Sequence, residues 1–290
     1  MTLPWRRLRD ESVARLRDAA VDDPEQEVRW IVERATGMAP AEQASAVDRP
    51  ATEREVRSVD QMVHRRAGGE PLQYVLGRWG FRTLDLLVDR RVLIPRPETE
   101  VVAGLAIDAA RAVDGTPLVV DLGTGSGAIA LSLAAELWPD VEVWATDLSA
   151  DAVAVARANL AGLGRRAAVV RLAEGDWFAA LPADLRGRID VLVSNPPYVA
   201  TSDELPREVA EWEPLDALLA GADGLDALRA IVGGALGWLR AGGELVLEIG
   251  DAQGDAASEI ARAAGLVEVR VEPDLTGRDR VLLAQRGPGS

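Results

Sequence analysis

The 290-residue sequence contains no cysteine, no lysine and one histidine, His64. Without cysteine the chain cannot form disulfides, thiolate metal sites or a cysteine nucleophile, and a single histidine argues against a histidine-based triad or metal cluster. His64 falls in a predicted helix, where a surface or packing role is the simplest interpretation. Any catalysis must therefore work largely without imidazole, and no metal is expected.

Long apolar runs are also missing. No stretch approaches the ~20 residues that span a bilayer, and residues 1–7 lack the apolar core of a signal peptide. We therefore expect a cytoplasmic protein with no membrane partner.

The basic residues are few, since 32 arginines face 47 acidic residues and the net charge is -15. Residues 1–75 hold 12 of these arginines and 14 acidic residues, so most of the excess negative charge falls on residues 76–290. Because affinity for phosphate backbones comes mainly from Lys and Arg, this balance disfavours direct nucleic-acid binding.

Residues 1–75 carry helix signals. Asp23-Pro24 predicts the start of a helix that ends at Thr36, with Gly37 beyond it. Thr52 and Glu55 have capping-box spacing before a helix that closes at Gly68-Gly69. We expect a small helical bundle.

The apolar period changes to two further on, where Leu84, Leu86 and Val88 alternate with polar residues. This pattern predicts a linking β-hairpin within residues 76–95. Residues 96–290 then alternate strand and helix patterns, which predicts an α/β fold with a parallel, doubly wound, Rossmann-like sheet. Its seven expected strands are Leu118 to Asp121, Val141 to Thr146, Ala168 to Leu172, Ile189 to Ser194, Glu244 to Ile249, Val267 to Val271 and Arg280 to Ala284.

A glycine-rich segment follows the first strand of this sheet. It comprises Gly123, Thr124, Gly125, Ser126 and Gly127. Glycines let a ligand approach the backbone and expose N–H groups at a helix N-terminus. The segment also fits a dinucleotide fingerprint, so alone it leaves NAD and S-adenosylmethionine open.

Acidic residues near the glycines favour S-adenosylmethionine. Asp121 suits a ligand amino group and would repel a pyrophosphate, while Asp147 at the next strand end could bind a ribose diol. Asp176 and Trp177 follow the third strand and could hold an adenine by polar contact and stacking. Helix capping by Asp147 and core packing of Trp177 are the alternative interpretations.

The tetrapeptide Asn195-Pro196-Pro197-Tyr198 follows the fourth strand. A planar nitrogen is a weak nucleophile because its lone pair is delocalised, so a methylating site must grip its N–H groups. The Asn195 oxygen and a neighbouring carbonyl offer two acceptors, since proline has no N–H to donate. A simple turn is the alternative.

These four segments sit at successive strand ends, which is where doubly wound sheets bind ligands. Their shared position favours one active site over four unrelated features. The sequence therefore predicts methyl transfer to a planar nitrogen.

The chain resembles the peptide chain release factor glutamine N5-methyltransferases, which are class I S-adenosylmethionine-dependent enzymes. The resemblance covers most of residues 69–284, and Ile94 to Glu100 with the preceding hairpin is its family-specific part. The other supporting segments are Gly69 to Gly77, Phe81 to Val88, the glycine loop, Ser194 to Tyr198, Glu213-Pro214, Ala217-Leu218, Asp223 to Leu225, Gly242-Gly243, Glu248 to Gly250 and Asp274 to Arg280. Ala222 departs from an expected glycine.

The resemblance implies roles for individual residues. The glycine loop, Asp147, Asp176 and Trp177 would hold S-adenosylmethionine and its product S-adenosylhomocysteine, together with Asn195. Asn195 and the Pro196 carbonyl would accept the two N–H groups of a glutamine amide, and Pro197 and Tyr198 would complete the slot. The implied substrate is the Gly-Gly-Gln loop of class I release factors, which act in translation termination, and the helical region would help to recruit them.

Three other functions stay open. A nucleic-acid amino-methyltransferase acting on adenine N6, cytosine N4 or guanine N2 would use the same tetrapeptide, but would be expected to carry a basic, aromatic-lined surface. A sensor or scaffold that retains the cofactor pocket would not need the acceptors. A nicotinamide dehydrogenase would need a proton donor for which there is no candidate.

Overall fold

The computed structural model describes residues 3–289, and the chain forms two units, each with its own core. The first comprises the residues up to Arg78 together with residues 206–212, and the second comprises residues 79–205 and 213–290. The inclusion of residues 206–212 in the first unit was not indicated by the sequence. Within residues 3–289, no helix is long and apolar enough to cross a membrane.

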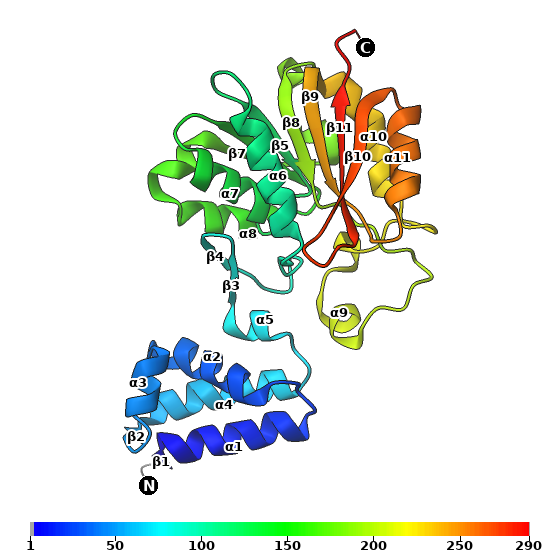
Figure 1. Cartoon of the computed structure of the whole chain (residues 1–290). Helices are drawn as coiled ribbons and strands as arrows, with labels where there is room; N and C mark the ends of the chain where they lie inside the picture. The colour runs from blue at the N-terminus through cyan, green and yellow to red at the C-terminus, as the bar shows by residue number, and fades with distance from the viewer. Residues whose placement is uncertain (1–2, 290) are drawn as a thin grey trace. The chain divides into compact units, whose positions relative to one another are not determined.

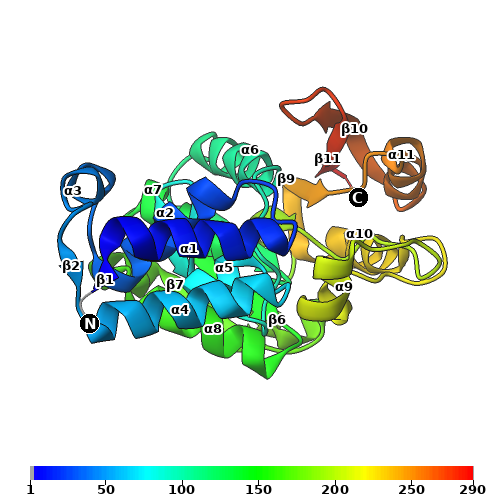
Figure 2. The ribbon, with the colours of Figure 1, turned by 90° about the horizontal axis from the view of Figure 1, so that it is seen from below.

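The first unit is helical (Figures 1 and 2). Apolar residues on one stripe of each long helix form its core, among them Trp5, Leu16, Ile31 and Val59, all at most 1% exposed. Its elements are β1 (Leu3–Pro4), α1 (Trp5–Asp18), α2 (Pro24–Thr36), α3 (Pro40–Ser45), β2 (Pro50–Ala51), α4 (Glu53–Ala67), α5 (Leu72–Leu76) and α9 (Arg207–Trp212), with β1 paired to β2.

The predicted helix caps are confirmed. The Asp23 carboxylate accepts from the Gln26 N–H at 3.2 Å, and Gly37 ends α2 in the left-handed conformation with φ 76°. At α4 the Glu55 carboxylate accepts from the Thr52 N–H at 2.7 Å, and the Thr52 hydroxyl accepts from the Glu55 N–H at 3.3 Å. These bonds satisfy N–H groups that a helix start leaves unpaired.

The predicted hairpin and sheet are also present. β3 (Arg78–Phe81) pairs with β4 (Leu84–Leu87). The seven-stranded sheet has the order β10-β11-β9-β8-β5-β6-β7. Its strands are β5 (Leu118–Leu122), β6 (Glu142–Asp147), β7 (Val170–Glu174), β8 (Ile189–Ser194), β9 (Leu239–Glu248), β10 (Leu266–Pro273) and β11 (Asp279–Arg286).

The sheet is parallel, as expected, in all but one strand. β11 runs antiparallel to both β9 and β10, whereas the pairs among β5 to β9 are parallel. The physical reason is the connection, because residues 274–278 are too few for the crossover that a parallel neighbour requires. A short turn therefore reverses the chain.

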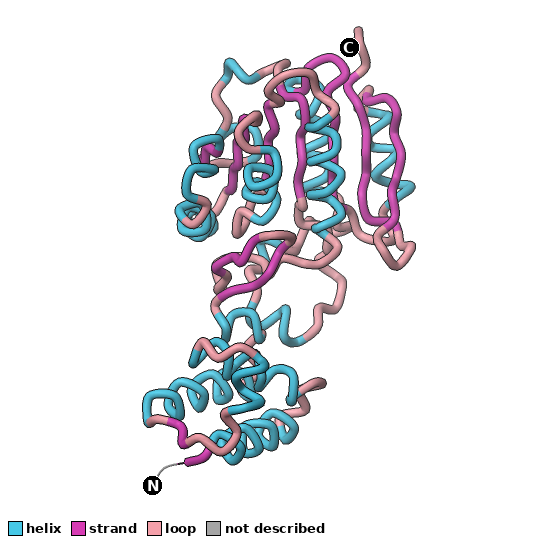
Figure 3. Tube along the Cα trace, turned by 60° about the vertical axis from the view of Figure 1, so that its left-hand side comes forward, coloured by secondary structure: helices cyan, strands magenta, loops and turns pink. Residues whose placement is uncertain are grey.

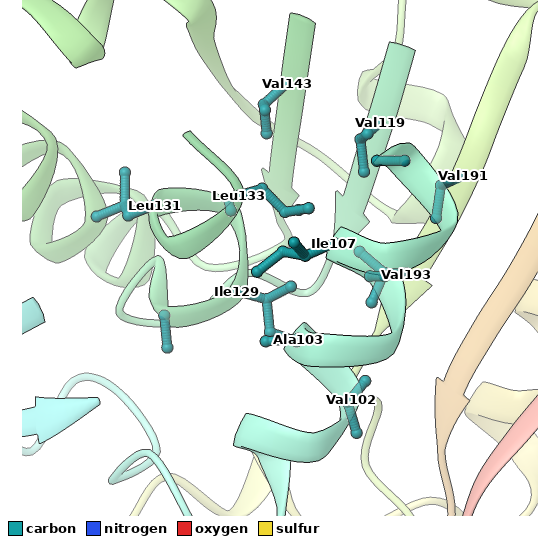
Figure 4. Packing of buried hydrophobic residues seen from close by; sticks show 14 of the residues in the cluster. Val102, Ala103, Ile107, Val119, Ile129, Leu131, Leu133, Val143, Val191 and Val193 are labelled. Carbon is teal, nitrogen blue, oxygen red and sulfur yellow. The ribbon is translucent and has the colours of Figure 1, made fainter. Parts of the chain in front are cut away.

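Helices cover both faces of the sheet (Figure 3). Val119, Val191 and Val193 point to the face where Ile107 of α6 and Ile129 of α7 pack (Figure 4). Alternate residues such as Val120 and Leu192 pack on the other face, against α10 and α11. The helices of this unit are α6 (Thr99–Arg111), α7 (Ala128–Leu137), α8 (Ala150–Ala161), α10 (Asp226–Trp238) and α11 (Gly254–Ala263).

Candidate active site

The glycine loop joins the end of β5 to the start of α7. Gly123, Gly125 and Gly127 have φ values of 71°, 55° and 86°, which are costly for residues with a Cβ. A Cβ at Gly127 would lie 2.9 Å from the Leu131 side chain, whereas one at Gly125 would meet nothing within 4 Å. The loop therefore keeps an open backbone surface around Gly125.

Asp147, the last residue of β6, holds this loop in place. Its two carboxylate oxygens accept from the Gly125 N–H at 2.8 Å and from the Ser149 N–H at 2.9 Å. Burial raises the pKa of Asp147, and these two backbone hydrogen bonds oppose that effect. Because a carboxylate has about four acceptor positions, Asp147 can still accept from a ligand hydroxyl.

Trp177 lies over the glycine loop. Its ring would be 3.4 Å from a Cβ at Gly123, so a side chain at position 123 would press against the indole. Trp177 has a φ of 42°, which is rare for a residue with a Cβ and sets the direction of its ring. The preceding Asp176 is exposed. An aromatic face and a carboxylate thus stand side by side at the end of β7.

Asp121 differs from the expectation that it faces a ligand amino group. It is 1% exposed, and one oxygen accepts from the Thr124 hydroxyl at 2.7 Å and the Ala130 N–H at 3.2 Å. Burial raises its pKa to about 7. The reason is that the glycine loop folds over this carboxylate, so Asp121 supports the loop from beneath.

Asn195 to Tyr198 follow β8. The Ser194 hydroxyl donates to the Leu122 carbonyl at 2.6 Å, which fixes the end of β8 beside the end of β5. The Asn195 side-chain N–H donates to the Thr99 hydroxyl at 3.1 Å. Burial, reinforced by the charge of Glu248, raises the pKa of Tyr198 to about 12. The Tyr198 phenol is therefore neutral at physiological pH.

These strand ends surround a cleft of about 430 Å³, within the usual range for small-ligand pockets. The structure thus brings together most of the predicted site. The predicted residues that line the cleft are Gly123, Thr124, Gly125, Ser126, Asp147, Asp176, Trp177, Asn195 and Pro197.

Three predicted residues do not line the cleft, namely Gly127, Pro196 and Tyr198. The Gly127 N–H donates to the Thr124 carbonyl at 2.8 Å, so it serves the loop and not a ligand. Pro196 is buried, and the Tyr198 carbonyl accepts from the Gln253 side chain at 3.0 Å.

Two other segments line the cleft without having been assigned a role from the sequence. One supplies Arg91, Val92, Leu93, Pro95 and Thr99, and the other supplies Pro214, Asp216 and Ala217. Glu213 joins them, since its carboxylate accepts from Arg96 at 2.5 Å and from the Ile94 N–H at 3.1 Å while being 6% exposed. Most of them lie in segments that resemble the family, but Arg91 and Asp216 do not, and the sequence indicated no chemical role for any one of them.

Comparisons with known proteins agree with this geometry. Residues 7–77 match the family described as "PrmC N-terminal domain", and residues 110–211 match "Methyltransferase small domain". The solved structure of a methyltransferase from Pyrococcus furiosus covers 71% of this chain and 90% of its own at 20% identity and a TM-score of 0.51. The hMettl16 catalytic domain covers 79% and 82% at 18% identity and a TM-score of 0.56, and both likenesses concern the fold alone.

Curated relatives share much more sequence. A release factor glutamine methyltransferase of Xylella fastidiosa is 45% identical over 83% of this chain and 86% of its own length. Another, of Cereibacter sphaeroides, is 43% identical over 94% of this chain and 95% of its own. The chain belongs to the family of release factor glutamine methyltransferases.

Proposed function

We propose that this protein transfers a methyl group from S-adenosylmethionine to the side-chain amide nitrogen of the glutamine in the Gly-Gly-Gln loop of class I release factors. One observation carries the proposal: Asn195, an amide acceptor, lines the same cleft as the glycine loop, Asp147 and Trp177. The shared names of its relatives support the choice of substrate. We place this activity in the cytoplasm, with no metal and no direct nucleic-acid or membrane partner.

The cleft residues fit the cofactor. The open backbone at Gly125 would receive the methionine part, Asp147 would accept from the ribose hydroxyls, and Trp177 with Asp176 would hold the adenine. When bound, S-adenosylmethionine supplies an electrophilic methyl group on a sulfonium. The open loop at Gly125, the Asp147 carboxylate and the Trp177 ring thus match the methionine, ribose and adenine parts of S-adenosylmethionine.

The protein's own contribution is positioning. The Asn195 carbonyl oxygen and the Pro196 backbone carbonyl would accept the two N–H groups of the substrate amide and direct its lone pair toward the methyl group. These bonds strengthen as the nitrogen gains positive charge during transfer, so they stabilise the transition state more than the bound substrate. Pro197 and Tyr198 would flank the flat amide.

Proton removal needs no strong base in this scheme. In an in-line displacement the nitrogen–carbon bond would form as the carbon–sulfur bond breaks, and the nitrogen would then lose its proton to water because the alkylated amide is far more acidic. The neutral Tyr198 phenol is unsuited to act as a base, since its pKa is about 12.

The helical unit would recruit the release factor. Its match to the family's own N-terminal domain over residues 7–77 supports this role. The alternative, methylation of a nucleobase amine, is less well supported because residues 76–290 carry most of the net negative charge.

A labelling experiment tests the function. The enzyme is incubated with methyl-labelled S-adenosylmethionine and either release factor, its glutamine-to-alanine loop variant, DNA or RNA. We expect label on the release factor alone and none on the loop variant. Label on a nucleic acid, or undiminished label on the loop variant, would overturn the proposed substrate.

A further inference from the structure

Three hydrogen-bonded side chains lead from the wall of the cleft into the interior of the sheet unit, and the first two of them line the cleft. The Asn195 amide donates to the Thr99 hydroxyl at 3.1 Å, and that hydroxyl donates to a Glu248 carboxylate oxygen at 2.7 Å. Thr99 is 4% exposed and Glu248 is 1% exposed. The three residues come from the end of β8, the start of α6 and the end of β9. The tetrapeptide is thus connected to two elements that the sequence did not link to it.

The direction of these hydrogen bonds follows from what each group can donate. A threonine hydroxyl has one proton, and the ionised Glu248 carboxylate, which can only accept, takes it. The Thr99 oxygen can then only accept from Asn195, which requires the NH₂ end of that amide. The Asn195 carbonyl oxygen is left without a hydrogen bond in the described part of the chain, in a residue that lines the cleft.

The opposite orientation of the Asn195 amide would be unproductive. Its NH₂ group would then meet the N–H groups of the substrate, so that donors would face donors. Rotating the amide by half a turn would also place its carbonyl against the Thr99 oxygen, whose only proton is committed to Glu248. By accepting the Thr99 proton, Glu248 therefore determines which end of the Asn195 amide is free.

A carboxyl group is energetically unfavourable at the buried position of Glu248. Its second carboxylate oxygen is buried and has no partner among residues 3–289. The nearby Arg280 side chain donates instead to the Ile249 carbonyl at 3.2 Å and lies 3.5 Å from the Asp274 carboxylate. A buried carboxyl with so few partners costs stability, and such groups concentrate at functional sites.

We infer that Thr99 and Glu248 are positioning residues that hold the Asn195 amide with its carbonyl oxygen toward the substrate nitrogen. The inference rests on the proposed role of Asn195. Neither residue needs to touch the reacting atoms, because both act through the orientation of that one amide.

Substitutions at Thr99 test this role by methyl-transfer kinetics. Thr99→Val keeps the shape but removes the hydroxyl, so we expect kcat to fall on the order of 10- to 100-fold, as for other small misplacements of a reacting group. The KM for S-adenosylmethionine should stay within about threefold, since the bonds of Asp147 are untouched. Thr99→Ser retains the hydroxyl and should restore most of kcat.

A matched control separates positioning from packing. Ser132 in α7 is fully buried, and its hydroxyl donates to the Ala128 carbonyl at 2.7 Å and not to any of the three residues. Ser132→Ala also deletes a buried hydroxyl, but it should leave kcat unchanged. At Glu248, Glu248→Gln keeps an acceptor and should retain most of kcat, whereas Glu248→Leu should lower it as Thr99→Val does.

A double-mutant cycle gives the decisive readout. If Thr99 acts through Asn195, adding Thr99→Val to Asn195→Ala should change kcat by less than about twofold, although the same change is costly in the wild type. Equal kcat for the Val and Ser variants, or a full additional loss in the double variant, would overturn the inference. Failure of the release factor to accept label would instead overturn the proposed function, and the cycle could still be measured on whichever acceptor is labelled.

Discussion

The helical unit and the strand ends around the cleft treat their carboxylates in opposite ways. In the helical unit, acids pair with arginines, as Glu27 does with Arg66 at 2.7 Å and Asp60 does with Arg15 at 3.0 Å. In the sheet unit, Asp121, Asp147 and Glu248 are held by hydroxyl or backbone N–H groups instead of arginines. Elsewhere the sheet unit also pairs acids with arginines, as Glu213 does with Arg96, so the difference belongs to these three strand-end acids.

The pKa values reflect this difference. Burial raises the pKa of all three strand-end acids, to about 7 for Asp121 and Glu248. At Glu55 in the helical unit, hydrogen bonds from Thr52 and Arg49 outweigh burial and lower the pKa. The helical unit thus places its charges where they stabilise it, while the sheet unit tolerates buried acids around the cleft.

The largest effect should come from the cleft. Asn195→Ala removes the acceptor that orients the nucleophile, and we expect turnover to fall by about 10²- to 10³-fold, as when an oxyanion-hole donor is lost. Calorimetric affinity for S-adenosylmethionine should change only a few-fold. Near-normal turnover would show that Asn195 does not orient the substrate.

The next effect concerns pH and stability. Burial raises the pKa of Glu248 to about 7, and the negative charge of Glu98 adds to this effect. The positive charges of Arg280 and Arg96 oppose it. A raised carboxyl pKa gives stability that is present below pH 4.5 and is lost as the pH rises through about 7. Thr99 and Tyr198 also face this carboxyl.

Glu248→Gln should remove that loss. Relative to the variant, the wild type should lose up to about 3 kcal/mol of its free energy of unfolding between pH 5 and pH 8, because one pKa unit is worth about 1.4 kcal/mol. Urea denaturation at the two pH values measures this. The buried Asp121 contributes equally to both proteins, so parallel pH profiles would mean that Glu248 titrates normally.

Arg66 in α4 tests the arginine–carboxylate pairs of the helical unit. It bonds Glu27 through two nitrogens at 2.7 and 3.1 Å and Glu208 of α9 at 3.0 Å, with its side chain 12% exposed. Arg66→Ala leaves Glu27 poorly solvated and should destabilise the helical unit by about 2 kcal/mol in denaturant titration. Turnover on a short glutamine peptide should not change, and a comparable loss of peptide turnover would contradict the separation of roles.

Asp147→Ala should have a smaller, specific effect. It removes hydrogen bonds to a charged acceptor that are worth about 1.5 to 3 kcal/mol, part of which supports the loop, so we expect S-adenosylmethionine affinity to fall by about tenfold. Isothermal calorimetry measures the change. An unchanged dissociation constant would refute the assigned contact with the ribose.

The smallest effect on stability is expected for an exposed ion pair. Arg57 lies in α4 like Arg66, but its side chain is 69% exposed and it pairs with Glu53 at 3.4 Å. Arg57→Ala should change stability by less than about 0.5 kcal/mol, because exposed pairs gain little and are screened by salt. A loss as large as that of Arg66→Ala would mean that burial does not set the value of these pairs.

Local patterns predicted much of this molecule. The Thr52 and Glu55 cap, the Gly37 helix end and the seven strands depend on nearby residues. Their positions agreed with the sequence to within about two residues, except that β9 begins at Leu239 and not at Glu244. The glycine loop and Asn195 could be placed in one cleft because parallel strands end at the same sheet edge.

Contacts between distant residues could not be predicted in this way. Thr99 and Glu248 are separated by 149 residues, and neither carries a local pattern that indicates contact. Asp121 looked accessible because a sequence does not show the loop that covers it. The antiparallel β11 was missed because strand periodicity carries no direction.

The position of α9 has a consequence for how the chain is made. The ion pair between Arg66 and Glu208 spans 142 residues, and the helical unit gains its last segment only after β5 to β8 have been synthesised. On the ribosome this unit therefore stays incomplete until residue 212 has emerged.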